Sequence, residues 1–134
     1  MPHVVVQYTA NLEPGADVGA LCKALAEVLV AQRDGSGASV FPIGGTRVLA
    51  YPAAQFAVAD GATERAFVYV NVRIARGRER ALVDAAGEAM MAVVRAHFAE
   101  LLAKRALGIT LQIDEGAPVF DAKHGTLHPL FAGK

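Results

Sequence analysis

Position 2 carries the residue best suited to unusual chemistry, a proline directly after the initiator methionine. A penultimate residue as small as Pro2 favours removal of Met1 by an aminopeptidase, which leaves the proline nitrogen as a free secondary amine. A terminal amine has a pKa of about 7.7–8.0, so it titrates near neutrality and can act as a general acid or base. The simpler interpretation is structural, because proline is tolerated at the first position of a strand.

Arginine dominates the basic residues and outnumbers lysine nine to four. Arg47 follows a pair of glycines, and a second group surrounds the end of a predicted strand: Arg73, Arg76, Arg78 and Arg80. The planar fork of N–H donors in arginine matches a carboxylate. Arg78 also precedes a predicted helix, whose amino-terminal end favours an anion. The alternative for such a cluster is an ordinary solvated loop.

Two histidines near the carboxyl end have the spacing of metal ligands. His124 and His128 are four residues apart, and Asp121 lies close by. Gly125 and Pro129 argue against the helix that would align the pair, so we expect no metal site here.

Length and composition predict one domain over residues 1–134, with residues 116–134 as a carboxyl-terminal arm. This arm is expected to be anchored by its apolar residues, which are Val119, Phe120, Leu127, Leu130 and Phe131. Thirteen basic and thirteen acidic side chains cancel, which argues against nucleic acid or an anionic membrane as a partner. The single cysteine, Cys22, cannot form an internal disulfide, so a cytoplasmic location is expected. The amino-terminal residues do not have the pattern of a signal peptide, and no apolar run reaches the length of a membrane span.

The mean hydropathy of +0.34 is high for a chain of this size. Burial of surface between subunits would explain it, so we expect an oligomer.

Hydrophobic periodicity predicts four strands and two helices. The strands are expected at 3–8, 46–51, 66–74 and 109–113. The first helix is capped by Asp17 and ends near Arg33, and the second runs from about Glu79 to Arg105. His97 lies on the apolar stripe of the second helix, where a hydrogen-bonded packing residue is expected.

The order β-α-β-β-α-β predicts an α+β, two-layer fold, a four-stranded sheet with both helices on one face. A ferredoxin-like arrangement and one built from two βαβ units with a pseudo-twofold both satisfy this order. Periodicity alone does not separate them. Either leaves one face of the sheet without a partner, which again favours oligomerisation.

Taken together, these residues resemble the 5-carboxymethyl-2-hydroxymuconate isomerase family of the tautomerase superfamily. The matching stretches occur in family order over nearly the whole chain. They are Pro2-His3, the run from Phe41 to Arg47, Ala59-Asp60-Gly61, Ala66-Phe67-Val68, Gly77-Arg78, Ala86-Gly87-Glu88, His97-Phe98 and the run from His128 to Phe131. The chain departs from the family in a longer loop at residues 34–39 and in a few added carboxyl-terminal residues.

The resemblance implies a tautomerase fold, a homotrimer and a cofactor-independent isomerase that needs no metal. It implies that Pro2 is the catalytic base and that Arg47 and Arg78 bind substrate carboxylates. The expected substrate is 5-carboxymethyl-2-hydroxymuconate or a similar unsaturated 2-hydroxy polycarboxylate, which is converted to its conjugated 2-oxo isomer. This reaction belongs to the catabolism of aromatic compounds such as homoprotocatechuate.

Two alternatives remain open at this point. One is another tautomerase-superfamily enzyme, a tautomerase or a dehalogenase, that acts on a different small carboxylate. A dehalogenase needs an acidic residue to activate water, and the candidates are Glu13, Glu64 and Asp114. The other alternative is a non-catalytic, ferredoxin-like oligomeric binding module, in which Pro2 would have no chemical role.

Overall fold

Alternating apolar residues build a four-stranded sheet. In the computed structural model, which describes residues 1–133, the strands are β1 (His3–Thr9), β2 (Arg47–Ala53), β3 (Ala66–Ala75) and β4 (Leu107–Gly116). Every second residue of β3 from Ala66 to Ile74 is buried, which is the two-residue period of a strand with one covered face. The four predicted strands are confirmed, although β4 extends beyond 109–113 at both ends.

The strand order is β2-β1-β3-β4. β1 and β2 pair in parallel, β3 and β4 pair in parallel, and β1 and β3 pair antiparallel. Each βαβ unit therefore keeps its two strands side by side, and the units are related by a pseudo-twofold. A ferredoxin-like sheet would split these units, so this arrangement is excluded and the tautomerase arrangement is confirmed.

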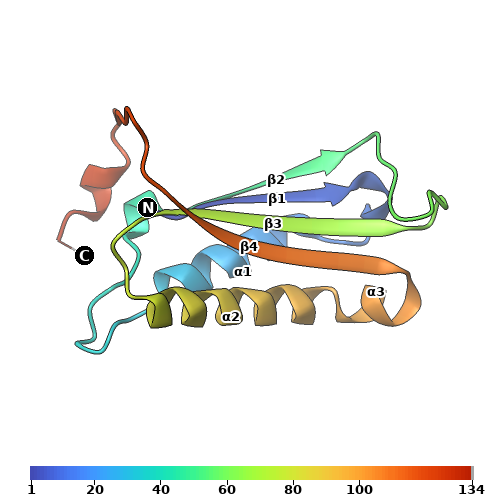
Figure 1. The fold of residues 1–134 in the computed structure, drawn as a ribbon, viewed down its shortest axis with the longest axis horizontal. Helices are drawn as coiled ribbons and strands as arrows, with labels where there is room; N and C mark the ends of the chain where they lie inside the picture. The colour runs from blue at the N-terminus through green and yellow to red at the C-terminus, as the bar shows by residue number, and fades with distance from the viewer. Residues whose placement is uncertain (134) are drawn as a thin grey trace.

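Two amphipathic helices, α1 (Val18–Val30) and α2 (Arg80–His97), cover the same face of the sheet (Figure 1). Asp17 caps α1, as predicted, since its carboxylate accepts a hydrogen bond from the amide of Ala20 at 3.3 Å. The buried residues recur every three or four positions: Val18, Leu21, Leu25 and Leu29 on α1, and Val83, Ala86, Met90 and Val94 on α2. Burial of each of these valine, leucine and methionine side chains contributes about 1.5–3 kcal/mol.

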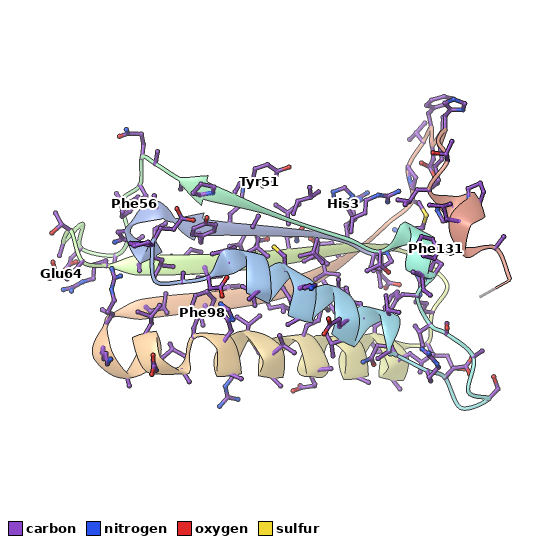
Figure 2. The ribbon with its side chains drawn as sticks, turned by 180° about the vertical axis from the view of Figure 1, so that it is seen from behind. His3, Tyr51, Phe56, Glu64, Phe98 and Phe131 are labelled. Carbon is purple, nitrogen blue, oxygen red and sulfur yellow. The ribbon has the colours of Figure 1, made fainter. Side chains whose placement is uncertain are left out.

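The prediction of one helix over 79–105 is wrong at Phe98. The chain leaves helical geometry there (φ −98°, ψ 13°) and continues as α3 (Ala99–Lys104). Phe98 is only 1% exposed and lies between the sheet and the helices (Figure 2). The adjacent His97 Nε2 lies 2.6 Å from the carbonyl oxygen of Ala16, which confirms its expected role in packing. These two side chains fix the end of α2, and the break follows from their burial.

The segment after β4 rises away from the sheet beside the amino terminus (Figure 1). It contains η3 (His128–Phe131), which packs on η2 (Ile43–Gly45); a third short 3₁₀ helix is η1 (Ala10–Leu12). The expectation that apolar residues anchor this arm is wrong for most of them in the single chain. Phe131 is half-buried, whereas Val119, Phe120, Leu127 and Leu130 are exposed. The arm extends beyond the core, so its own chain covers Leu127 and Leu130 only in part and leaves Val119 and Phe120 almost fully exposed.

The second face of the sheet has no helices over it. His3 and Tyr51 project from this face (Figure 2), and Leu49 and Tyr51 are 41% and 51% exposed. We call it the open face. Within the described residues, none of the helices has the length and hydrophobicity needed to cross a membrane.

Candidate active site

The strand directions bring distant parts of the chain to the amino terminus. β1 begins where β3 and β4 end, because β1 runs antiparallel to both. β2 begins at the same end, and the amide of Arg47 donates to the carbonyl oxygen of Pro2 at 3.2 Å. The turn after β3 and the arm after β4 also leave the sheet here (Figure 1). Side chains from four strands, one turn and the arm can therefore meet around Pro2.

A cavity of about 430 Å³ lies at this end of the sheet. Most of its polar lining is basic, and Asp121 is its acidic member. The lining residues are Met1, His3, Arg47, Arg73, Ile74, Ala75, Gly116, Pro118, Asp121 and Lys123. A cavity with two guanidinium groups and one ammonium group is suited to a small molecule that carries carboxylates.

Pro2 and Arg47 lie side by side at the start of two parallel strands. Pro2 is buried and Arg47 is half-buried. The Nη1 atom of Arg47 lies 3.4 Å from the carbonyl oxygen of Gly45, which keeps the side chain over the start of β2. The structure therefore brings together the first two of the three predicted site residues.

Arg78 is held from three directions near the end of β3. Its Nε donates to the carbonyl oxygen of Val40 and its Nη1 to that of Ala75, both at 3.2 Å. Its guanidinium carbon lies 4.7 Å from the centre of the buried Phe41 ring. Arg78 does not line the cavity itself, but its charge reaches the amino terminus.

The electrostatic environment favours a neutral amine at this end of the chain. Burial lowers the pKa of the Met1 amino group, and the charges of Arg78, Lys123 and Arg47 lower that pKa further. The charge of Asp121 raises the pKa of this amino group. A free amine on Pro2 would occupy the same cluster of cations.

The side chain of Met1 fills a narrow slot between η2 and η3. Its sulfur lies 3.0 Å from Nε2 of His128. A Cβ atom added to Gly45 would lie 2.6 Å from Cγ of Met1, so the slot has no room for a larger residue at position 45 while Met1 is present. In the chain with Met1 attached, the nitrogen of Pro2 is an amide without a basic lone pair.

Sequence reasoning missed several residues of the cavity. His3, Lys123 and Asp121 were not predicted there, and Arg73 was recognised only as part of a basic cluster. The signal that places His3 and Arg73 is strand register: His3 pairs with Arg47 on one side and with Arg73 on the other. The positions of Asp121 and Lys123 depend on the path of the arm, which hydrophobic periodicity does not describe.

A larger hollow of about 620 Å³ lies between α2 and the free edge of β4, away from Pro2. Its one cation is Arg80, whose Nε is already paired with Asp84 at 2.9 Å. Glu88 and Glu115 also line it, so the hollow does not favour carboxylate ligands. The smaller basic cavity is the better candidate for the active site.

Among residues 1–133, no group of three His, Cys, Asp or Glu side chains is arranged to hold a metal ion. Asp121 pairs with Lys123, and His128 contacts Met1.

The comparison with protein families gives a match over nearly the whole chain. The family model described as 5-carboxymethyl-2-hydroxymuconate isomerase matches residues 2–131. The chain is 29% identical over 131 residues to 5-carboxymethyl-2-hydroxymuconate Delta-isomerase of Escherichia coli, covering 98% of this chain and 99% of that protein.

Solved structures agree with this match. A crystal structure of a 5-carboxymethyl-2-hydroxymuconate delta-isomerase is 46% identical, with a TM-score of 0.94, and the alignment covers 100% of this chain and 95% of that one. A 5-carboxymethyl-2-hydroxymuconate isomerase from Deinococcus radiodurans R1 is 32% identical, with a TM-score of 0.86 and coverage of 97% and 93%.

A more distant structure, a wild-type fused 4-OT described as a symmetric trimer, is 27% identical with a TM-score of 0.56, and covers 98% of both chains. The fold, the basic cavity beside Pro2 and these matches lead to one conclusion. The chain belongs to the 5-carboxymethyl-2-hydroxymuconate isomerase family and is an isomerase.

Proposed function

We propose that this isomerase converts 5-carboxymethyl-2-hydroxymuconate, or a closely similar 2-hydroxy polycarboxylate, to its conjugated 2-oxo isomer through the amine of Pro2. The observation that carries the proposal is the position of Pro2 between Met1 and His3, which both line a cavity rich in cations. The names of the related proteins supply the substrate class. The reaction would serve the catabolism of aromatic compounds, in the cytoplasm.

Pro2 becomes the base once Met1 has been removed. A base must be neutral to accept a proton, so its activity is present above its pKa and is lost as the pH falls through it. The lowered pKa of an amine at this end of the chain keeps more of it neutral near pH 7.

The proton transfer needs no change in oxidation state overall. The Pro2 nitrogen removes the proton from the 2-hydroxyl group, and the oxygen electrons form the C2=O bond. The C2=C3 electrons move to C3=C4, and the C4=C5 electrons take a proton at C5. The same protonated amine can return the proton there, so one residue acts as base and then as acid.

Arg47 and Arg78 bind the carboxylates and stabilise the dienolate formed when the proton leaves. Both lower the pKa of the terminal amine through their charge, so both lie close enough to act on an anion held beside it. The contacts of Arg78 with Val40, Ala75 and Phe41 fix its position before the substrate arrives.

Pro2→Ala tests the mechanism directly. We expect kcat to fall about 100-fold, the lower range of what a positioned general base contributes, because the primary amine of an amino-terminal alanine lacks the ring that fixes the proline nitrogen in place. Arg78→Ala should lower kcat and also raise KM, because it removes a carboxylate ligand. Arg76→Ala, an exposed position two residues away, is the matched control and should behave like the wild type. An unchanged kcat in Pro2→Ala, measured by ultraviolet absorbance, would exclude the mechanism.

A dehalogenase would need a carboxylate that activates water beside Pro2. Glu13 accepts a hydrogen bond from Tyr8 near the other end of β1, and Glu64 also lies at that end, far from His3 (Figure 2). Asp114 accepts a hydrogen bond from Asn71 at 2.7 Å. The acidic residue that lines the cavity, Asp121, is paired with Lys123. These positions favour the isomerase over a hydrolytic alternative.

The open face supports a homotrimer as the assembly. Leu49 and Tyr51, on the edge strand β2, expose apolar surface on a sheet face that no helix covers. The fused 4-OT structure of similar fold is described as a symmetric trimer. A second and a third copy would cover this face.

A further inference from the structure

We propose that Arg73 binds a third carboxylate of the substrate and so determines the preference for a substrate with a carboxylate-bearing branch. The inference rests on the proposed function and extends it from two carboxylate-binding arginines to three. 5-Carboxymethyl-2-hydroxymuconate carries two carboxylates at the ends of its chain and one on its carboxymethyl branch.

Arg73 lies in the same row of the sheet as the residues around Pro2. His3 pairs with Arg47 of β2 on one side and with Arg73 of β3 on the other, so the three side chains leave the open face in one line. Neighbouring strands are about 4.8 Å apart, so the Cα atoms of Arg47 and Arg73 are separated by about 10 Å. Both side chains line the same cavity, from opposite sides of His3.

The charge of Arg73 has no partner among the residues that could supply one. Its cross-strand neighbour on β4 is Asp114, whose Oδ2 accepts a hydrogen bond from Nδ2 of Asn71. Asp121, the acidic residue of the cavity, is paired with Lys123. Among residues 1–133, no carboxylate lies within 4.0 Å of the guanidinium of Arg73. A guanidinium left unpaired in a cavity is available to an anionic ligand.

The position of Arg73 depends on a glycine. A Cβ atom added to Gly116 would lie 2.1 Å from Nη2 and 2.6 Å from Cζ of Arg73. The guanidinium therefore lies directly against the backbone at the end of β4, in a space that a larger residue would occupy. This contact places the guanidinium of the exposed Arg73 side chain at the wall of the cavity, where it faces both solvent and a bound ligand.

The three arginines differ in what they can do. Arg47 and Arg78 lower the pKa of the Met1 amino group through their charge, and Arg73 lies on the opposite side of His3 from Arg47. Arg73 is therefore placed to bind a part of the substrate that does not react. A contact of this kind strengthens binding of substrate and transition state equally, so its loss raises KM more than it lowers kcat.

The test compares two substrates: 5-carboxymethyl-2-hydroxymuconate, and 2-hydroxymuconate, which lacks the branch. We define the discrimination as the ratio of their kcat/KM values. Arg73→Gln should lower this ratio about ten- to hundredfold, the range expected for loss of a hydrogen bond between charged groups. The change should appear in KM for the branched substrate.

Three further variants test whether the preference depends on the position of the Arg73 guanidinium, on its planar shape, or only on positive charge in this region. Gly116→Ala keeps every charge but displaces the guanidinium, and should lower the ratio in the same direction as Arg73→Gln. Arg73→Lys keeps the charge without the planar fork and should retain part of the preference. Arg76→Gln removes an exposed charge outside the cavity and should leave the ratio unchanged. Circular dichroism and size-exclusion chromatography check that each variant folds and keeps its assembly.

The inference is overturned if Arg73→Gln and Gly116→Ala are both folded and retain the wild-type ratio. This includes the case in which kcat/KM falls by the same factor for both substrates. These outcomes are distinct from failure of the proposed function. If Pro2→Ala loses activity and the ratio is insensitive to Arg73, only the third carboxylate site is wrong. If Pro2→Ala keeps full activity, the proposed function is wrong whatever the ratio.

Discussion

At the scale of single residues, the presence of Met1 determines whether Pro2 can act as a base. The Met1 side chain lies in the slot between Gly45 and His128, directly beside Pro2. Removal of Met1 would have two consequences: it converts an amide nitrogen into an amine, and it empties the slot next to that amine. Substrate access and the catalytic group would thus arise from the same processing step.

Substitutions at two adjacent glycines should differ in their effect on stability once Met1 has been removed. In the processed protein, Gly45→Ala should change the free energy of unfolding very little, because the three nearest atoms to an added Cβ all belong to Met1. Gly44→Ala should lower it by about 1 kcal/mol, since its Cβ would lie 3.0 Å from Nδ1 and 3.2 Å from Cα of His128. Urea denaturation of both variants measures the difference. Equal destabilisation would contradict the account of the slot.

Among the arginines, the sequence could not distinguish a ligand-binding side chain from a solvated one. Arg80 and Arg78 are two residues apart, yet Arg80 pairs with Asp84 on the surface of α2 and Arg78 is fixed beside Phe41. Their positions depend on the turn after β3 and on contacts with residues far away in the sequence. Only the family resemblance singled out Arg47 and Arg78, and their roles stay predictions until tested.

At the scale of elements, hydrophobic periodicity was sufficient to predict what each segment forms. Strands and helices follow from side chains that alternate or recur every three or four residues, as in β3 and α1. Periodicity does not predict which strands pair with each other. A strand with one buried face has the same alternation of apolar and polar residues whichever strand lies beside it. The choice between the two sheet arrangements therefore rested on the family resemblance, and the observed strand order confirms it.

The ends of elements were also difficult to predict. α2 ends at His97 because two side chains, His97 and Phe98, make tertiary contacts that local propensity does not describe. The apolar residues of the arm after β4 were expected to be buried. Most of them are exposed instead, because the arm makes few contacts with the rest of its own chain. Exposed apolar residues of this kind are characteristic of surfaces that another subunit covers.

At the scale of the whole molecule, the open face should be the surface that joins the subunits. Leu49→Lys would place a charge on this face at the edge strand β2 and should shift the protein to a smaller species, measured by light scattering after size-exclusion chromatography. Leu102→Lys is the matched control, because Leu102 is similarly exposed, 40% against 41%, but lies on α3. Dissociation by Leu102→Lys, or an intact assembly in Leu49→Lys, would contradict the proposed interface.

The central claim is that Pro2 carries a neutral, titratable amine surrounded by cations. Of the six prolines in the chain, only Pro2 can have a nitrogen that titrates, because the other five are internal tertiary amides. Nitrogen-15 NMR of protein labelled at proline measures this directly. We predict one titrating resonance with a pKa below the usual 7.7–8.0, which coincides with the acidic limb of kcat/KM and moves upward in Arg78→Gln. An active enzyme in which no proline nitrogen titrates, or in which the Pro2 pKa is not lowered, would contradict the account.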